Sequence, residues 1–121
     1  MLTIYHNPAC SKSRQTLEIL RKNGNDPVVV PYLEQPPAAA RILQLAGMLG
    51  CPVAALLRRG EELFRNATDL PALHDDAALA AWIERHPRVL ERPIVVDDAN
   101  RRAIIGRPPE NVLQLIETRH E

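Results

Sequence analysis

Eleven prolines divide this chain of 121 residues into short segments, and they constrain its fold more than any other feature of the sequence. Proline has no backbone N–H to donate, so helix interiors and central strands have to lie between the prolines. Residues 2–5 and 28–32 are apolar, strand-like runs, and residues 11–23 between them have the spacing of an amphipathic helix. This β-α-β order predicts a parallel pair of strands.

Helical patterns fill the middle of the chain. An amphipathic run covers about 36–50, and a short helix is expected over 52–58. Residues 59–73 are rich in Gly, Asn, Asp and Pro, which indicates a loop with one helical turn. A further helix begins after a pair of aspartates, either of which can cap it, and ends before Pro87.

The end of the chain returns to strands. Residues 93–96 and 103–105 are strand-like and flank a polar turn of hairpin length, and a last amphipathic helix begins near Pro108. The complete order is compatible with an α/β fold of the thioredoxin-like kind, a four-stranded mixed sheet flanked by helices and interrupted by an all-helical insertion. We expect one domain over residues 1–121, with its core at about 1–35 and 88–121 and the insertion at about 36–87.

Cys10 lies in the loop between the first strand and the first helix. Unpaired backbone N–H groups and the positive end of the helix converge there, and Lys12 and Arg14 add positive charge. Such surroundings lower the pKa of a thiol, and they can also hold a tetrahedral oxyanion such as phosphate, sulfate or arsenate. The nucleophile and the anion site would then coincide. The alternative is that Cys10 is a small buried residue that only packs.

His6 and Cys51 each allow two interpretations. His6 either orients or titrates with the thiol, or is a loop histidine bonded to the backbone. Cys51 either resolves an oxidised Cys10 or packs between two helices. No ligand spacing, and hence no metal site, is expected among the histidines His6, His74, His86 and His120.

Composition argues against several classes of partner. The chain has 15 basic and 15 acidic residues and 3% aromatic residues, which disfavours a nucleic-acid-binding surface. Its two cysteines form no disulfide framework, and no apolar run approaches the ~20 residues that span a bilayer. Since no signal peptide pattern opens the chain, a cytoplasmic location is expected.

Several segments match one family in order along nearly the whole chain: residues 4–10 with Ser13 and Arg14, 32–34, 36–37, 55–58, 92–96 and 106–108. On these segments the chain resembles the glutaredoxin-coupled arsenate reductases of the ArsC family, which have a thioredoxin fold. It departs from the best-known members directly after Cys10, where Ser11 and Lys12 replace Gly-Thr. The loop is most similar to a branch of the family with Cys-Ser-Lys-Ser.

The resemblance implies roles for particular residues. Cys10 would attack arsenate, with His6 beside it in the catalytic loop. Arginine presents a fixed fork of donors that suits a tetrahedral oxyanion. The implied substrate-binding residues are Arg58, Arg92, Arg107, Ser13, Arg14 and Lys12, although Lys12 can equally be a solvated side chain. Pro93 is implied to follow a cis peptide bond.

The implied reaction reduces arsenate to arsenite through a thiol–arsenate intermediate and a mixed disulfide between Cys10 and glutathione, which glutaredoxin then reduces. No bound cofactor is expected, and glutathione is the cosubstrate. Because residue 13 is serine, no Cys-x-x-Cys pair exists, and an external thiol is needed. We expect a monomer without nucleic-acid or membrane partners.

Two alternatives to this reaction stay open. One is a thiol oxidoreductase that acts on another oxyanion or on glutathionylated partners. The other is a non-catalytic relative of the Spx regulators, which typically carry a Cys-x-x-Cys switch that this chain lacks.

Overall fold

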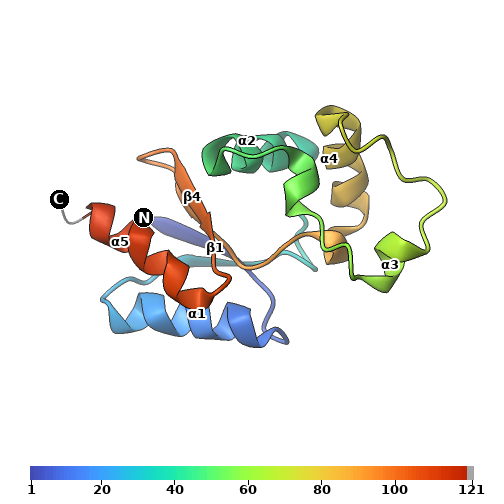
Figure 1. Ribbon diagram of the computed structural model, residues 1–121. Coiled ribbons are helices and arrows are strands. Elements are labelled where there is room, and N and C mark those ends of the chain that lie inside the picture. Colours follow the sequence, from blue (N-terminus) through green and yellow to red (C-terminus); the bar gives the residue numbers. More distant parts are fainter. Residues whose placement is uncertain (120–121) are drawn as a thin grey trace. The chain divides into compact units, whose positions relative to one another are not determined.

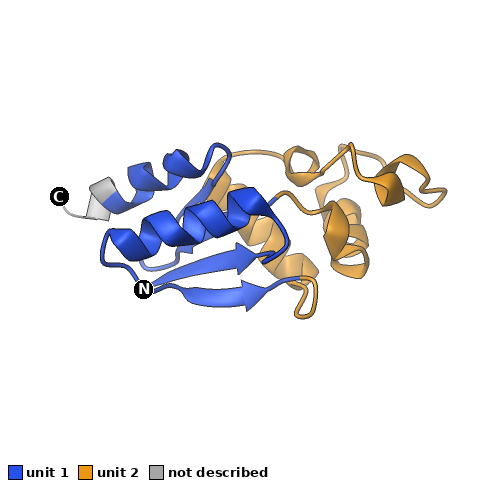
Figure 2. Ribbon diagram, turned by 90° about the horizontal axis from the view of Figure 1, so that it is seen from below, with its two compact units in different colours: residues 1–32, 92–121 blue, residues 33–91 orange. Residues whose placement is uncertain are grey.

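The computed structural model describes residues 1–119, with those from 117 onward described by their backbone alone. It divides into two compact units (Figure 2). Unit 1 joins residues 1–32 to residues from 92 onward, and unit 2 is residues 33–91. These boundaries lie a few residues from the predicted core and insertion. That the two units act as a single domain stays a prediction.

Unit 1 is a four-stranded mixed sheet with helices. The strand order is β2-β1-β3-β4, with β1 and β2 parallel and the other neighbours antiparallel. The predicted mixed sheet, its parallel β-α-β pair and its closing hairpin are therefore confirmed. The elements of unit 1 are β1 (Leu2–His6), α1 (Ser11–Lys22), β2 (Val28–Pro31), β3 (Ile94–Asp97), β4 (Arg102–Ile105), a 3-10 turn (Pro109–Asn111) and α5 (Val112–Arg119).

The core of unit 1 lies where α1 and α5 pack together and against the sheet (Figure 1). β2 is an edge strand, which explains why Val28 and Val29 stay exposed and why Pro31 can end it. The buried side chains of this core come from both helices and the two central strands: Leu2, Ile4, Leu17, Leu20, Val95, Val112, Leu115 and Ile116.

Unit 2 is built from helices. α2 packs against α4, and α2 ends at Gly50, whose φ of 70° is a left-handed conformation that glycine adopts without strain. Apolar side chains on both helices are fully buried, among them Leu45 and Trp82. The elements of unit 2 are α2 (Ala39–Leu49), a 3-10 turn (Val53–Leu56), α3 (Glu62–Arg65), α4 (Asp76–Arg85) and a second 3-10 turn (Pro87–Val89).

The short helix predicted over 52–58 is wrong in its second half. A 3-10 turn ends at Leu56, and Leu57 is extended and forms an antiparallel bridge with Leu90. The Arg58 N–H donates to the Val89 carbonyl at 2.7 Å, and the Glu91 N–H donates to Leu56 at 2.7 Å. Bonds to a distant segment thus replace the helical bonds, and they hold the backbone at Arg58.

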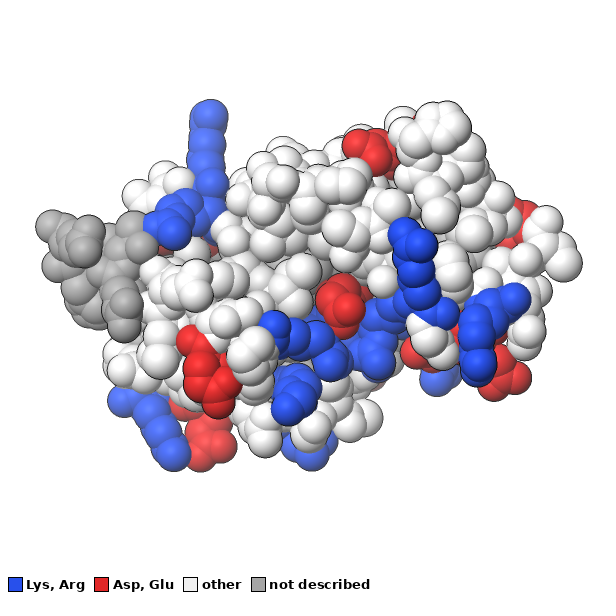
Figure 3. Space-filling view, viewed as in Figure 1, with Lys and Arg blue, Asp and Glu red and all other residues white. Residues whose placement is uncertain are grey.

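Charge and hydropathy follow no single-purpose pattern. Basic and acidic side chains are interspersed on the face shown in Figure 3, as the equal numbers of the two types suggest. Among residues 1–119, no helix is long and apolar enough to cross a membrane.

Candidate active site

Cys10 is the N-cap residue of α1, with extended backbone angles (φ −95°, ψ 122°). Its N–H donates to the Asn7 carbonyl at 2.9 Å, and its own carbonyl accepts from the Arg14 N–H at 3.0 Å. The buried Asn7 also accepts the Ala9 N–H on its side-chain oxygen at 3.0 Å. These local bonds fix the loop and leave the thiol half-buried at the positive end of the helix.

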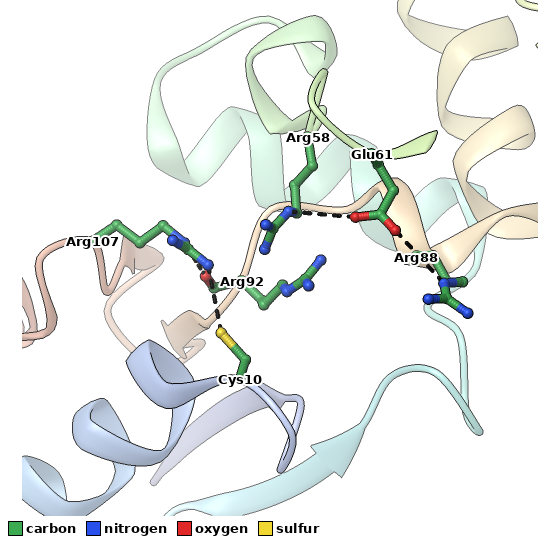
Figure 4. A network of polar contacts seen from close by, with 6 residues as sticks. All are labelled: Cys10, Arg58, Glu61, Arg88, Arg92 and Arg107. Carbon is green, nitrogen blue, oxygen red and sulfur yellow. Dashed lines mark hydrogen bonds and ion pairs between the residues drawn. The ribbon is translucent and has the colours of Figure 1, made fainter. Parts of the chain in front are cut away.

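Arg107 lies directly against the thiol. Its Nη2 is 3.5 Å from the Cys10 sulfur, and its Nε donates to the Arg92 carbonyl at 2.7 Å (Figure 4). Arg92 precedes β3 and Arg107 follows β4, and the hairpin register pairs Ile94 with Ile105, which brings these two ends of the hairpin together. The arginines are thus adjacent because the strands are paired.

Both arginines precede a proline in a cis peptide bond. The Arg92–Pro93 bond is cis, as the family resemblance implies, and the Arg107–Pro108 bond is also cis, which no sequence pattern indicated.

The surroundings of Cys10 lower its pKa. Burial alone raises the pKa of the thiol, but hydrogen bonding from the Ser13 N–H, the Arg92 side chain and the Lys12 N–H, together with the charge of Arg107, lowers it below the ordinary value. The sulfur makes no short capping bond of the kind an oxygen makes at this position. Backbone amides and two arginines therefore favour the thiolate, the nucleophilic form.

His6 contacts the loop through Ser13. The His6 Nδ1 and the Ser13 hydroxyl are 2.6 Å apart, and the same hydroxyl accepts the Asn7 N–H at 3.0 Å. Both side chains are buried. Burial lowers the pKa of His6, and the charges of Arg21 and Arg14 lower it further, so the neutral ring is favoured. The hydrogen bond between Nδ1 and the Ser13 hydroxyl makes the neutral His6 ring a support for the loop.

Three predicted substrate-binding residues follow Cys10 on α1. The Ser13 hydroxyl is fully buried and bonded to His6 and Asn7, so Ser13 acts on the sulfur through its backbone N–H. Arg14 donates from Nη1 to the Pro8 carbonyl at 2.8 Å and thereby supports the loop. The Lys12 side chain is exposed.

Arg58 and Cys51 belong to unit 2. The Arg58 Nε lies 4.0 Å from one oxygen of Glu61, and the other oxygen lies 3.7 Å from the Arg88 Nε (Figure 4). Within the described residues, the buried Arg58 Nη1 has no hydrogen-bond partner. Cys51 is a half-buried free thiol, and burial, with the charge of Asp76, raises its pKa. The two cysteines thus differ in the direction of their pKa shifts.

Three further residues support this site; sequence patterns singled out neither Thr16 nor Asn111, and they marked Gly106 only as part of the matched segment 106–108. Thr16 is fully buried on α1, Gly106 packs against it, and Asn111 donates from Nδ2 to the Arg107 carbonyl at 3.1 Å. A polar residue on the apolar face of a helix was the available signal for Thr16. For Asn111, the signal was only its closeness to Arg107 in sequence.

Over the described part of the chain, no group of three or more His, Cys, Asp or Glu side chains is placed to hold a metal ion. His120, one of the histidines considered above, lies outside the described residues.

Comparisons with known proteins agree on one family. A sequence model described as the ArsC family matches residues 5–115. The uncharacterized protein YfgD of Escherichia coli (strain K12) is 47% identical, over 93% of this chain and 94% of that protein. An arsenate reductase of Acidiphilium multivorum is 40% identical, over 95% of this chain and 80% of that protein. The solved structure of an arsenate reductase from Vibrio cholerae superposes with a TM-score of 0.82 and 43% identity, covering 93% of this chain and 95% of that one.

Proposed function

The chain belongs to the ArsC family, and from this premise we propose that it reduces arsenate to arsenite with Cys10 as the nucleophile. The observation that carries the proposal is the position of the Cys10 sulfur at the N-terminus of α1, with the Arg107 guanidinium 3.5 Å away and with Arg92 among the groups that lower the pKa of the thiol. The same donors that stabilise a thiolate suit an incoming oxyanion.

The proposed reaction has three steps. The Cys10 thiolate attacks arsenic(V), and one arsenate oxygen leaves as water after protonation, which leaves a sulfur–arsenic bond. The thiolate of glutathione then attacks the Cys10 sulfur. The electron pair of the sulfur–arsenic bond passes to arsenic, which leaves as arsenite, and Cys10 is left in a disulfide with glutathione. A glutaredoxin thiol reduces that disulfide, so two electrons in total come from external thiols.

The arginines neutralise the charge that accumulates in the first step. An arsenate anion that approaches a thiolate meets like charge, so cations at the sulfur lower the barrier to attack. We assign Arg92 and Arg107 to this role on their contacts with Cys10, and Arg58 on the family resemblance. The N–H groups of Lys12 and Ser13 stabilise the thiolate.

The remaining predicted residues support this machinery. We propose that Arg14 and His6 hold the loop in shape through the Pro8 carbonyl and the Ser13 hydroxyl. We also propose that Pro93 sets the direction in which Arg92 faces the site. The exposed Lys12 side chain adds positive charge along the approach of the anion.

Glutathione and glutaredoxin are the proposed reductants because this chain has no second cysteine next to Cys10 in sequence. Burial and Asp76 raise the pKa of Cys51, which disfavours its thiolate and hence a resolving role. We propose that the protein acts as a monomer in the reducing cytoplasm, where both cysteines stay free. Light scattering of the purified protein tests the monomer.

The test is arsenate-dependent oxidation of NADPH by the purified protein with glutathione, glutaredoxin and glutathione reductase. Turnover is expected in the wild type and in Cys51→Ser, and it should be lost in Cys10→Ser. Turnover that survives Cys10→Ser, or that Cys51→Ser alone abolishes, would contradict the external-thiol mechanism.

A second candidate, reduction of a different oxyanion or of glutathionylated partners, is favoured by one observation. Ser11 and Lys12 depart from the Gly-Thr of the best-known reductases, and the chain is 47% identical to the uncharacterized YfgD. Arg92→Ala and Arg107→Ala separate the candidates. Both variants should lose reduction of an oxyanion, whereas reduction of a glutathionylated peptide should tolerate them.

A further inference from the structure

We propose that Thr16 and Gly106 form a spacer contact that fixes how closely Arg107 approaches the Cys10 sulfur, which makes Thr16 a positioning residue of the site. The inference rests on the proposed role of Cys10 as a thiolate nucleophile. It concerns unit 1 alone, since both members of the contact and both residues that it positions belong to that unit.

Thr16 lies on the helix that carries Cys10 at its N-cap. Its side chain is completely buried, and its hydroxyl donates to the Lys12 carbonyl at 2.8 Å. The same oxygen lies 3.5 Å from the Gly106 carbonyl. Thr16 is therefore fixed to the first turns of α1 and faces the segment that follows β4.

Gly106 leaves no free space on the side that faces α1. A Cβ atom at this position would collide with the Thr16 hydroxyl, and it would lie 3.0 Å from the Thr16 methyl group and 2.9 Å from the Pro93 ring. The backbone at residue 106 thus approaches Thr16 as closely as any residue can, and only glycine permits it. The size of the Thr16 side chain and the absence of a side chain at Gly106 together set the separation between α1 and the segment that follows β4.

Residue 107 follows directly, and its position depends on that separation. The Gly106 N–H donates to the Pro93 carbonyl at 2.9 Å, and the Arg107 Nε donates to the Arg92 carbonyl at 2.7 Å. Asn111 holds the Arg107 carbonyl at 3.1 Å. Hydrogen bonds therefore join residues 92–93, before β3, to residues 106–107, after β4. We call these four residues the bracket, and the bracket packs against Thr16 through Gly106.

The two arginines of the bracket, Arg92 and Arg107, lower the pKa of Cys10. Arg107, which follows β4, lies 3.5 Å from the sulfur through its Nη2, and Arg92, which precedes β3, also lowers the pKa of the thiol. The Lys12 and Ser13 N–H groups reach it from α1 itself, so they do not move when the bracket moves. A larger residue at position 106 should push the bracket away from α1. It should weaken the effects of Arg92 and Arg107 on the sulfur and leave those of the Lys12 and Ser13 N–H groups unchanged.

Four proteins test the proposal, all carrying Cys51→Ser so that Cys10 is the only thiol: the parent, Gly106→Ala, Gly106→Ala with Thr16→Ala, and Gly47→Ala. Gly47 is an exposed glycine within α2 with open space around its missing Cβ, which makes it the matched glycine control. The pKa of Cys10 is read from the ultraviolet absorbance of its thiolate as a function of pH. The rate of alkylation by iodoacetamide at neutral pH supports the reading.

Gly106→Ala should raise the pKa of Cys10 and slow its alkylation by about threefold. Removing the Thr16 hydroxyl and methyl group in the double variant relieves the collision with Thr16 but leaves the 2.9 Å approach to the Pro93 ring, so both quantities should return part of the way to the parent values. Gly47→Ala should leave them unchanged. A Gly106→Ala protein that melts earlier but keeps the parent pKa would overturn the proposal, because a merely structural contact behaves in that way.

The experiment tests the proposal even if Gly106→Ala does not fold or the parent does not reduce arsenate. If Gly106→Ala alone does not fold, the double variant has to fold, since the collision with Thr16 is then what excludes the Cβ atom, and a double variant that also fails to fold overturns the proposal. Arsenate turnover is measured on the parent in parallel. A parent without turnover counts against the proposed function, while the pKa comparison still decides the spacer contact.

Discussion

The Arg107 guanidinium acts directly on the thiolate, since its Nη2 lies 3.5 Å from the Cys10 sulfur and its charge lowers the pKa of the thiol. Arg107→Ala should raise the pKa of Cys10 and lower the thiolate fraction at neutral pH. Arg107→Lys keeps a charge but cannot keep both contacts of the guanidinium, so an intermediate value is expected. Thiolate absorbance in a Cys51→Ser background measures this, and Arg102→Ala, at an exposed residue of β4, is the control.

The same pKa shift affects stability. Because the folded pKa of Cys10 lies below its unfolded value, the unfolded chain binds more protons between the two values, and stability rises with pH there. This contribution is present above the unfolded pKa and is lost as pH falls through the folded pKa. Cys10→Ser should abolish it.

His6 should make the protein sensitive to mild acid. Burial lowers the pKa of His6 below the ordinary value of 6.5, so folding has to keep the ring neutral. The stability that this provides is present above pH 6.5 and is lost as pH falls toward the folded pKa. His6→Gln cannot titrate, so its urea-unfolding free energy should depend less on pH in this window. Parallel profiles for the variant and the wild type would contradict the proposed neutral His6.

At the scale of elements, α4 offers a direct check of helix capping. Two aspartates were candidates from sequence, and the structure assigns the cap to Asp75, whose carboxylate accepts the Ala78 N–H at 3.1 Å. Asp75→Ala should lower the unfolding free energy by about 1 kcal/mol, whereas Asp75→Asn, which keeps an acceptor oxygen, should retain most of it. Urea denaturation measures both. Equal stability of Asp75→Ala and wild type would show that the cap contributes nothing.

The elements themselves were largely predictable because their signals are local. Proline positions and apolar spacing give the β-α-β start, the helical middle and the closing hairpin. The extended stretch at Leu57 was not predictable, since its hydrogen bonds go to residues 89–91, which lie far along the chain. Local pattern indicates what a segment can form, and distant partners decide what it does form.

The site was predictable to a similar extent. The position of Cys10 at a helix start follows from its flanking segments, and the family resemblance singles out Arg92 and Arg107. The bond between His6 and the Ser13 hydroxyl, and the packing of Gly106 on Thr16, depend on which side chains meet after folding. The sequence spacing of these residues does not predict which side chains come into contact.

At the scale of the whole molecule, the proposal makes the protein one component of an electron path. The chain has no Cys-x-x-Cys pair, and burial with Asp76 raises the pKa of Cys51, so the proposal takes the reducing electrons from an external thiol. The mixed disulfide between Cys10 and glutathione is the species in which that path and the arsenic chemistry meet.

The most direct measurement is a single-turnover reaction of Cys51→Ser protein with arsenate and glutathione, without glutaredoxin, followed by intact-mass analysis and quantification of arsenite. The account predicts that a glutathione adduct forms on Cys10, that it forms only with arsenate present, and that arsenite appears in equal amount. An adduct that forms equally well without arsenate, or arsenite that appears without an adduct on Cys10, would contradict it.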